Sequence, residues 1–169
     1  MTAALESNVT LPDGTEVHIR PIRPEDDQVL VDLFHHLSPQ TIYQRFFTAM
    51  PELSPGMARH LANVNYTNRL ALVAEAAGER IGVVRYERTN DPGIVELSVV
   101  IVDEWQGRGL GRLLIREIVR AAESNGINRF RADVLAENRR MLRLLAEELQ
   151  ILERKTEGGV TSLLLRSKG

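Results

Sequence analysis

The sequence contains no cysteine among its 169 residues. Disulfide bonds, thiolate catalysis and cysteine-ligated zinc or iron–sulfur sites are therefore excluded. It also lacks a long uncharged apolar run and an apolar segment near its N-terminus, and its formal net charge is only -2. We therefore expect no membrane association, no general attraction to nucleic acid, and a cytoplasmic location.

Histidine is scarce as well, with four residues in the chain. His35 and His36 are adjacent and would point to different faces of a helix, while His18 and His60 stand alone. Metal sites need several ligands that converge, so we expect no bound metal. The hydrophobic content of 43% is ample for a core, and the length fits one domain over residues 1–169.

The hydrophobic pattern predicts a mixed α/β (α+β) domain. A strand over 16–22 is followed by three helical segments that start near the prolines at 24, 39 and 55, the first reaching Leu37 and the third Val64. Further strands are expected at 70–74, 80–86, 94–102 and 129–135, a helix at about 138–149, and a hairpin around 157–159. Helices therefore flank a central group of strands in one packed domain.

Three glycines at alternate positions, Gly107, Gly109 and Gly111, lie between an apolar strand and a helix of leucines and arginines. Glycine lets the backbone approach a ligand without interference from Cβ atoms. The start of a helix offers unpaired N–H groups and the positive end of the helix dipole. This segment predicts a phosphate-binding site.

Four arginines, Arg108, Arg112, Arg116 and Arg120, follow at four-residue spacing along this helix. Cations in the first turn oppose the helix dipole by roughly 0.3 to 1 kcal/mol each, and a bound anion would remove that conflict. We therefore expect Arg108 and Arg112 to contact phosphate. A solvated arginine face is the alternative, and it is the favoured interpretation for Arg116 and Arg120.

Two other phosphate motifs fit poorly. A Walker A loop needs a lysine after its last glycine, and none follows Gly111. A dinucleotide fingerprint needs Gly-x-Gly-x-x-Gly early in a βαβ unit and an acidic residue about 20 positions on. Asp133 lies at about that distance, but the spacing here is Gly-x-Gly-x-Gly and four predicted strands precede it. A nucleoside triphosphatase and a dehydrogenase are both disfavoured.

The segment Gln106–Gly111 resembles the Gln/Arg-x-x-Gly-x-Gly/Ala signature of the GNAT acetyltransferase superfamily, which cradles the pyrophosphate of acetyl-coenzyme A. The resemblance implies a single domain with a mostly antiparallel central sheet, splayed around the acyl-coenzyme A site and flanked by helices. Four segments are similar to the catalytic domain of bacterial Pat-type protein lysine acetyltransferases: 19–24, 38–47, 69–74 and the stretch that begins at Asn138. The similarity spans about residues 16–166, which it implies are the core of the domain.

The resemblance also implies a set of cofactor-binding residues. The pantetheine arm would pair with the backbone of one strand, as a neighbouring strand would, and a backbone N–H near Val100 or Ile101 would polarise the thioester carbonyl. The expected cofactor-binding positions are Val99, Val100, Ile101, Gln106, Gly107, Arg108, Gly109, Leu110, Gly111, Arg112 and Asn138.

Glu96 is the only ionisable residue in the apolar run 94–102. Burial without a partner disfavours the charged form of a carboxyl, so the carboxylate takes up a proton more readily, as a general base must. Glu96 also matches the position of the glutamate that many superfamily members use as general base. It lies roughly 10 to 16 Å along the strand from residues 99–101 and would therefore act through water or a long acceptor side chain. The alternative is a structural glutamate paired with an arginine such as Arg85.

Two positions depart from the superfamily pattern. Asp103 stands where many members have a proline, which predicts a less rigid loop. Leu145 stands seven residues after Asn138, where many members have a tyrosine that protonates the leaving thiolate. Without that tyrosine, the coenzyme A thiolate would leave unaided or take its proton from water, because a thiol pKa is only ~8.5.

We therefore expect an N-acetyltransferase that uses acetyl-coenzyme A as co-substrate and acetylates lysine side chains of proteins. A small-molecule amine is the second candidate acceptor, and a non-catalytic acyl-coenzyme A sensor is the alternative of a different class. The sequence leaves open the acceptor, the acyl-chain preference, the oligomeric state and any regulatory ligand.

Overall fold

The computed structural model describes residues 5–168, which form eight strands, five α-helices and two 3-10 turns. The strands are β1 (Ser7–Thr10), β2 (Glu16–Pro21), β3 (Leu70–Ala76), β4 (Glu79–Arg88), β5 (Val95–Ile101), β6 (Arg129–Leu135), β7 (Leu149–Glu157) and β8 (Val160–Ser167). The helices are α1 (Asp27–Phe34), α2 (Pro39–Phe46), α3 (Pro55–Ala62), α4 (Leu110–Ser124) and α5 (Arg139–Glu148), and the turns are η2 (Pro24–Asp26) and η3 (Asp103–Trp105).

All eight strands form one sheet in the order β1-β2-β3-β4-β5-β6-β8-β7. Every neighbouring pair is antiparallel except β5 and β6, which run parallel because α4 connects them as a crossover. The predicted mixed fold with a mostly antiparallel sheet is confirmed.

The sheet divides between β5 and β6. These strands share only two registered pairs, Val95 with Phe130 and Glu96 with Arg131. By contrast, β6 pairs with β8 along its whole length, from Arg129 to Leu135. Beyond Glu96 the two strands separate, so the second half of β5 has no strand on that side.

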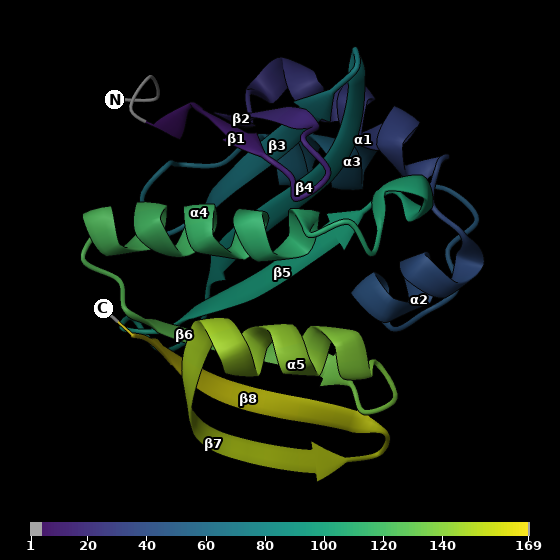
Figure 1. Ribbon diagram of the computed structural model, residues 1–169. Helices are drawn as coiled ribbons and strands as arrows, with labels where there is room; N and C mark the ends of the chain where they lie inside the picture. Colours follow the sequence, from purple (N-terminus) through teal and green to yellow (C-terminus); the bar gives the residue numbers. More distant parts are fainter. Residues whose placement is uncertain (1–4, 169) are drawn as a thin grey trace.

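Helices cover both faces of the sheet. Helices α4 and α5 lie in front of it in Figure 1, with their first turns at the same end, while α1 and α3 lie behind its β2–β5 part. The apolar stripe of α4, which includes Leu114, Ile115 and Ile118, packs in one core with alternate residues of the strands. A second core joins α1–α3 to the opposite face of β3 and β4.

One strand and the ends of two helices differ from the sequence prediction. Strand β1 was missed because it has only four residues and lies at the sheet edge, where pairing with β2 holds it. Helix α1 ends at Phe34, and Leu37 is buried beyond it. Helix α3 ends at Ala62, and Val64 packs against the second core from the following loop.

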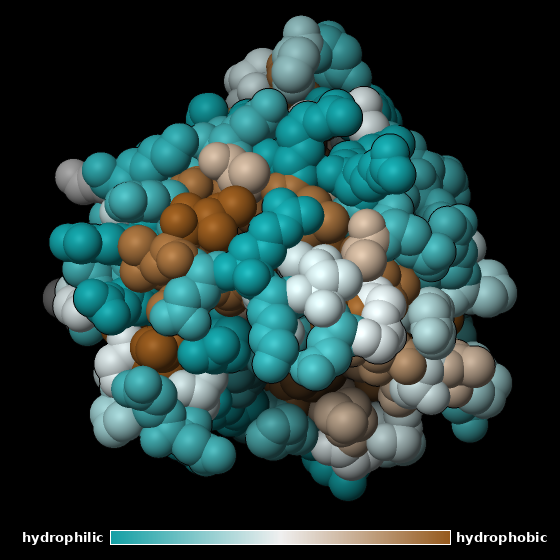
Figure 2. Space-filling view, turned by 90° about the horizontal axis from the view of Figure 1, so that it is seen from below, coloured by the Kyte–Doolittle hydropathy of each residue, from teal (hydrophilic) through white to brown (hydrophobic). Residues whose placement is uncertain are grey.

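The surface carries no dominant apolar face in the view from below. Figure 2 shows hydrophobic patches broken up by hydrophilic side chains. None of the helices in residues 5–168 has the length and hydropathy needed to cross a membrane.

A buried ion pair anchors the start of α1 to the sheet. Arg20 of β2 and Asp26 are 6% and 3% exposed, and the guanidinium donates two hydrogen bonds to the carboxylate, at 2.8 and 3.0 Å. Burial alone would raise the pKa of Asp26, but hydrogen bonds from Arg20 and from the Arg23 N–H outweigh it and lower the pKa below its usual 3.8. Asp26 is therefore a buried carboxylate whose partners keep it charged.

Replacing Asp26 with Asn should lower the free energy of unfolding by about 2 to 3 kcal/mol, because the buried Arg20 would lose its bidentate partner and keep only Glu75, at 3.3 Å, as a counter-charge. Because the pKa of Asp26 is lowered in the folded protein, the deficit should be full above pH 3.8 and shrink as the pH falls below it. Urea unfolding at several pH values measures this. The exposed Asp32→Asn is the charge-matched control, and an equal effect from both variants would contradict the role of the pair.

Candidate functional site

The separation of β5 from β6 opens a cleft of about 720 Å³. Residues 97–101 of β5 form one wall, residues 132–134 of β6 and the inner side of α5 form the other, and α2 contributes Thr41, Gln44 and Arg45. The glycine-rich segment before α4 closes one end of the cleft. Of the expected cofactor-binding residues, the following line it: Val99, Val100, Ile101, Gln106, Gly107, Gly109, Gly111, Arg112 and Asn138.

The β5 wall offers polar backbone groups. Strand β5 pairs with β4 along its length, but beyond Glu96 it has no registered partner on the β6 side. Leu97 is buried in the core beneath α4, whereas Ser98 and Val100 face the α1–α3 side. An extended ligand that enters the cleft can therefore pair with this strand edge as an added strand would.

The loop that leads into α4 presents free N–H groups. Gly107 and Gly109 have φ angles of +75° and +90°, and Gly109 is the N-cap residue, which has no side chain to cap the helix. Within residues 5–168 no backbone or side-chain acceptor takes the N–H groups of residues 107–111. The segment therefore has donors available at the positive end of a 15-residue helix, a position that favours anions.

Steric contacts explain the glycines at 109 and 111. A Cβ on Gly109 would lie 3.0 Å from Cδ of Pro12, and a Cβ on Gly111 would lie 3.2 Å from a methyl carbon of Leu144. The backbone of the loop therefore lies close to the β1–β2 turn on one side and to α5 on the other. A side chain at either position would press on these neighbours and shift the loop.

Gln106 and Asp103 hold the loop in place. The Gln106 side-chain amide donates to the Ile101 carbonyl at 2.9 Å and to the Thr41 hydroxyl at 3.1 Å. Asp103 accepts from the backbone N–H and hydroxyl of Ser38, at 2.8 and 2.7 Å, and from the Thr41 hydroxyl at 3.0 Å. Partial burial opposes its ionisation, but these bonds lower the pKa of Asp103. The expected loss of rigidity without proline is thus offset by hydrogen bonds to α2.

The structure places the Arg108 side chain and Leu110 away from the cleft. Arg108 lies 4.0 Å above the Trp105 ring and donates to Asp13 at 2.9 Å. Hydrogen bonds from Thr15 and then from Arg108 lower the pKa of Asp13 to about 2. Leu110 is 1% exposed and belongs to the core. For these two positions, only the backbone remains available to a ligand.

Arg112 lies at the cleft but already has anionic partners. Its guanidinium pairs with Glu147 and Glu148 of α5, and Arg116 also pairs with Glu148, at 2.6 Å. These ion pairs join α4 to α5 across one side of the cleft. The helix dipole opposes the charge of Arg112, and the sequence suggested that a bound phosphate would offset this repulsion. In the structure, the carboxylates of Glu147 and Glu148 offset part of it.

Helix α5 brings cations to the cleft that the sequence analysis did not select. Asn138 caps the helix, accepting from the N–H of Met141 at 3.3 Å. Three arginines that follow it on α5 line the cleft: Arg139, Arg140 and Arg143. The sequence did contain a signal for them, because Arg139 and Arg140 begin a helix whose dipole opposes a cation there, as in α4.

Glu96 lies at the point where β5 and β6 part. The expected burial is wrong, because the residue is exposed. It does not pair with Arg85 either, because that buried guanidinium donates to Glu87 at 3.1 Å. Burial and the charge of nearby Arg45 lower the pKa of Arg85 to about 10. Burial also lowers the pKa of Arg45, while the negative charges of Glu96 and Glu87 raise it, which sets Arg45 of α2 near Glu96.

No tyrosine lines the cleft in the described residues. Leu145 is 2% exposed and forms part of the apolar wall. The hydroxyls of Tyr66 and Tyr86 donate to the backbone carbonyls of Ile22 and Thr67, so both have structural roles. Tyr43 is exposed on α2. The cleft therefore contains no substitute for the missing tyrosine acid.

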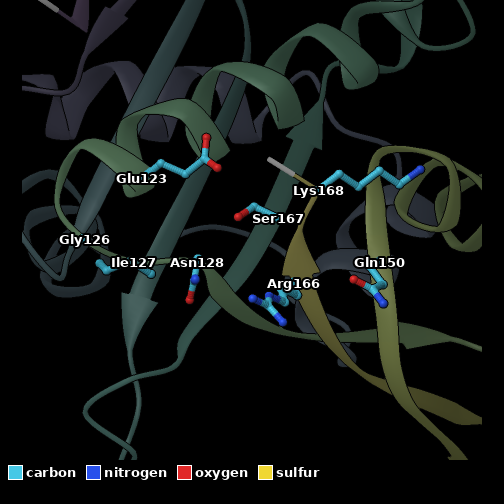
Figure 3. A pocket seen from close by; sticks show the side chains of 8 residues that line it. All are labelled: Glu123, Gly126, Ile127, Asn128, Gln150, Arg166, Ser167 and Lys168. Atoms are coloured by element: carbon cyan, nitrogen blue, oxygen red, sulfur yellow. The ribbon is translucent and has the colours of Figure 1, made fainter.

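A second hollow of about 530 Å³ lies at the end of α4 beside β7 and β8. In Figure 3 its side chains point apart rather than toward a common centre. Lys168 donates to the carbonyl of Glu147, and Arg166 and Glu123 come from separate elements. This hollow lacks the convergent polar groups of a binding site.

Comparison with known proteins decides the family. The family model described as acetyltransferase (GNAT) family matches residues 30–149, which include the cleft walls and the glycine-rich loop. The chain belongs to the GNAT acetyltransferase family. Members of this family use acetyl-coenzyme A, and the protein is an acetyltransferase.

Three similar proteins support this assignment. An acetyltransferase of Pseudomonas aeruginosa is 35% identical over 136 residues, covering 78% of this chain and 73% of that protein. The acetyltransferase Pat of Mycolicibacterium smegmatis is 26% identical over 140 residues, covering 81% of this chain but 42% of that protein. The crystal structure of the GNAT domain of S. lividans PAT superposes with a TM-score of 0.90 at 30% identity, covering 98% of this chain and 99% of that one.

Replacing Asp103 with Ala should lower the free energy of unfolding by about 1 to 3 kcal/mol, because the N–H and hydroxyl of Ser38 and the hydroxyl of Thr41 lose a charged acceptor. Urea unfolding measures the change. Asp103→Asn keeps one side-chain acceptor and should lose less. A deficit below about 0.5 kcal/mol for the alanine variant would show that these bonds do not hold the loop to α2.

Replacing Gly109 with Asp should abolish binding of coenzyme A, because a side chain at φ +90° meets Pro12 and brings negative charge to the N–H groups. Calorimetry measures binding, and circular dichroism checks the fold. Gly78→Asp is the matched control, since Gly78 has φ +77° and open space around it in the β3–β4 turn. A folded Gly109→Asp protein with undiminished affinity would refute the loop assignment.

Proposed function

We propose that this acetyltransferase transfers the acetyl group of acetyl-coenzyme A to lysine side chains of proteins, with Glu96 as the general base. The observation that carries the proposal is a single cleft with free backbone donors at one end and a carboxylate near the other. The likeness to the GNAT domain of S. lividans PAT over nearly the whole chain supports a protein acceptor.

The residues present fit acetyl-coenzyme A. The N–H groups of 107–111 would bind its pyrophosphate, and the glycines at 109 and 111 allow the loop to pack closely on Pro12 and Leu144. The edge of β5 at Val99, Val100 and Ile101 would pair with the pantetheine arm, and Asn138 holds the start of the facing helix. The co-substrate supplies an activated thioester, and a β5 N–H near Val100 or Ile101 would polarise its carbonyl.

Glu96 would remove the proton from the attacking ammonium. A lysine amine is protonated at neutral pH, since its ordinary pKa is ~10.4, and only the neutral amine attacks. Glu96 is exposed on the side of β5 that faces α2, at the last paired position before the cleft. Its separation from residues 99–101, roughly 10 to 16 Å along the strand, requires a water between carboxylate and amine.

The leaving thiolate would depart without a protein acid. The cleft holds an apolar Leu145 where the family often has a tyrosine, and no other tyrosine of the described chain lines it. A thiolate is a good leaving group near neutral pH because its conjugate acid has a pKa of ~8.5. Water at the open cleft can return the proton.

The acceptor class is tested by incubating the protein with acetyl-coenzyme A and a mixture of proteins, and measuring both thiol release and acetyl-lysine by mass spectrometry. The proposal predicts both. Thiol release only with small amines would replace the acceptor with a small molecule. Tight binding of acetyl-coenzyme A without turnover of any amine would indicate a sensor.

Replacing Glu96 with Gln should leave coenzyme A affinity unchanged and lower turnover at neutral pH by about 10² to 10⁴, the usual cost of losing a general base. The deficit should shrink as the pH approaches ~10.4, where free amine becomes abundant. Glu79→Gln, at the far end of β4, is the control. Wild-type turnover with a parallel pH–rate profile would show that Glu96 is structural and that the amine loses its proton elsewhere.

A further inference from the structure

The guanidinium of Arg140 reaches across the cleft from α5 to the glycine-rich loop. A Cβ built on Gly107 would lie 3.7 Å from one terminal nitrogen of Arg140 and 4.0 Å from the other. Arg140 belongs to the first turn of α5 and Gly107 to the segment before α4, and both line the cleft. The two terminal nitrogens therefore lie beside Gly107, at the start of the loop.

Arg140 differs from the other arginines near this loop. Arg108 pairs with Asp13, and Arg112 pairs with Glu147 and Glu148. In residues 5–168 no carboxylate lies within ion-pair distance of Arg140, and no hydrogen-bond acceptor takes its side chain. It is an exposed cation whose charge is not neutralised by the protein.

The position of Arg140 is electrostatically unfavourable without an anion. It stands in the first turn of α5, where the helix dipole repels a cation, and its guanidinium lies beside Gly107, in the loop that leads to the positive end of α4. In Figure 1 the first turns of α4 and α5 lie at the same end of the molecule. Two helix dipoles and one guanidinium thus converge on the same part of the cleft, which favours a doubly charged ligand there.

We propose that Arg140 is the side chain that binds the pyrophosphate of the acyl donor, opposite the loop N–H groups, and that it takes the role that the sequence suggested for Arg108. The proposal rests on the proposed function of the cleft. A guanidinium can donate two parallel hydrogen bonds to phosphate oxygens, so Arg140 would link α5 to the loop through the ligand.

The test compares Arg140→Ala with Arg108→Ala in calorimetric titrations with coenzyme A at several salt concentrations. Arg140→Ala should weaken binding about 10- to 100-fold, as expected for a charged hydrogen bond, and flatten the dependence of affinity on salt. Arg108→Ala should change the affinity less than threefold. Arg140→Lys keeps the charge but not the paired donors, and should fall between alanine and wild type. Arg154→Ala, on the exposed β7 strand, is the control for loss of one positive charge.

A donor without phosphates separates binding from structure. With S-acetylpantetheine, Arg140→Ala should acetylate the acceptor at the wild-type rate. This donor has no pyrophosphate, so neither the variant nor the wild-type protein can make the Arg140 contact with it. An equal loss with this donor would show that Arg140 supports the fold of α5 and would overturn the proposal.

The remaining outcomes distinguish this proposal from the function of the cleft. Wild-type affinity and salt dependence in Arg140→Ala, with binding abolished in Gly109→Asp, would refute the role of Arg140 and leave the loop site standing. Failure of the wild-type protein to bind coenzyme A would refute both. Circular dichroism and thermal unfolding of each variant establish that the fold is retained.

Discussion

The separation of β5 from β6 after two residue pairs is the constraint on which the site depends. Parallel strands that stay paired would satisfy each other's backbone groups and leave no room between them. Here α4 enters on one side of the split and α5 on the other, and their ion pairs through Arg112, Glu147 and Glu148 hold the two walls together. The cleft is thus a break in a hydrogen-bonded sheet, with these ion pairs linking α4 to α5 on one side of it.

The two ends of the cleft perform different tasks because their surroundings differ. At the loop, Gln106 and Asp103 fix the backbone through Thr41 and Ser38 of α2, so the N–H groups stay oriented without a ligand. Preorganised donors bind an anion without the cost of ordering the loop. At the other end, Glu96 stays exposed near Arg45, where water and an amine can reach it. One helix, α2, therefore borders both the phosphate end and the acceptor end.

The sequence was sufficient to predict those features that depend on local pattern. Alternating glycines before a helix predicted the loop, and alternation in 94–102 placed Glu96 and Leu97 on opposite faces of β5. Side-chain partners were beyond such reasoning. Asp13, which holds Arg108, lies 95 positions away along the chain, and the approach of Arg140 to Gly107 depends on the packing of α5 against α4. Alternation also assigns a residue to one face of a strand but does not show whether other elements cover that face. This is why burial of Glu96 was considered from the sequence, whereas the residue is exposed.

The central claim is that one acyl donor occupies the cleft from the loop to the edge of β5. The most direct measurement is a titration of the isotope-labelled protein with coenzyme A, followed by backbone amide chemical shifts in nuclear magnetic resonance spectra. The account predicts that the amides of residues 107–111 and of 99–101 shift together with one dissociation constant, while those around Asn128 and Ser167 in the second hollow do not. Shifts centred on that hollow, or shifts at the loop without any along β5, would contradict it.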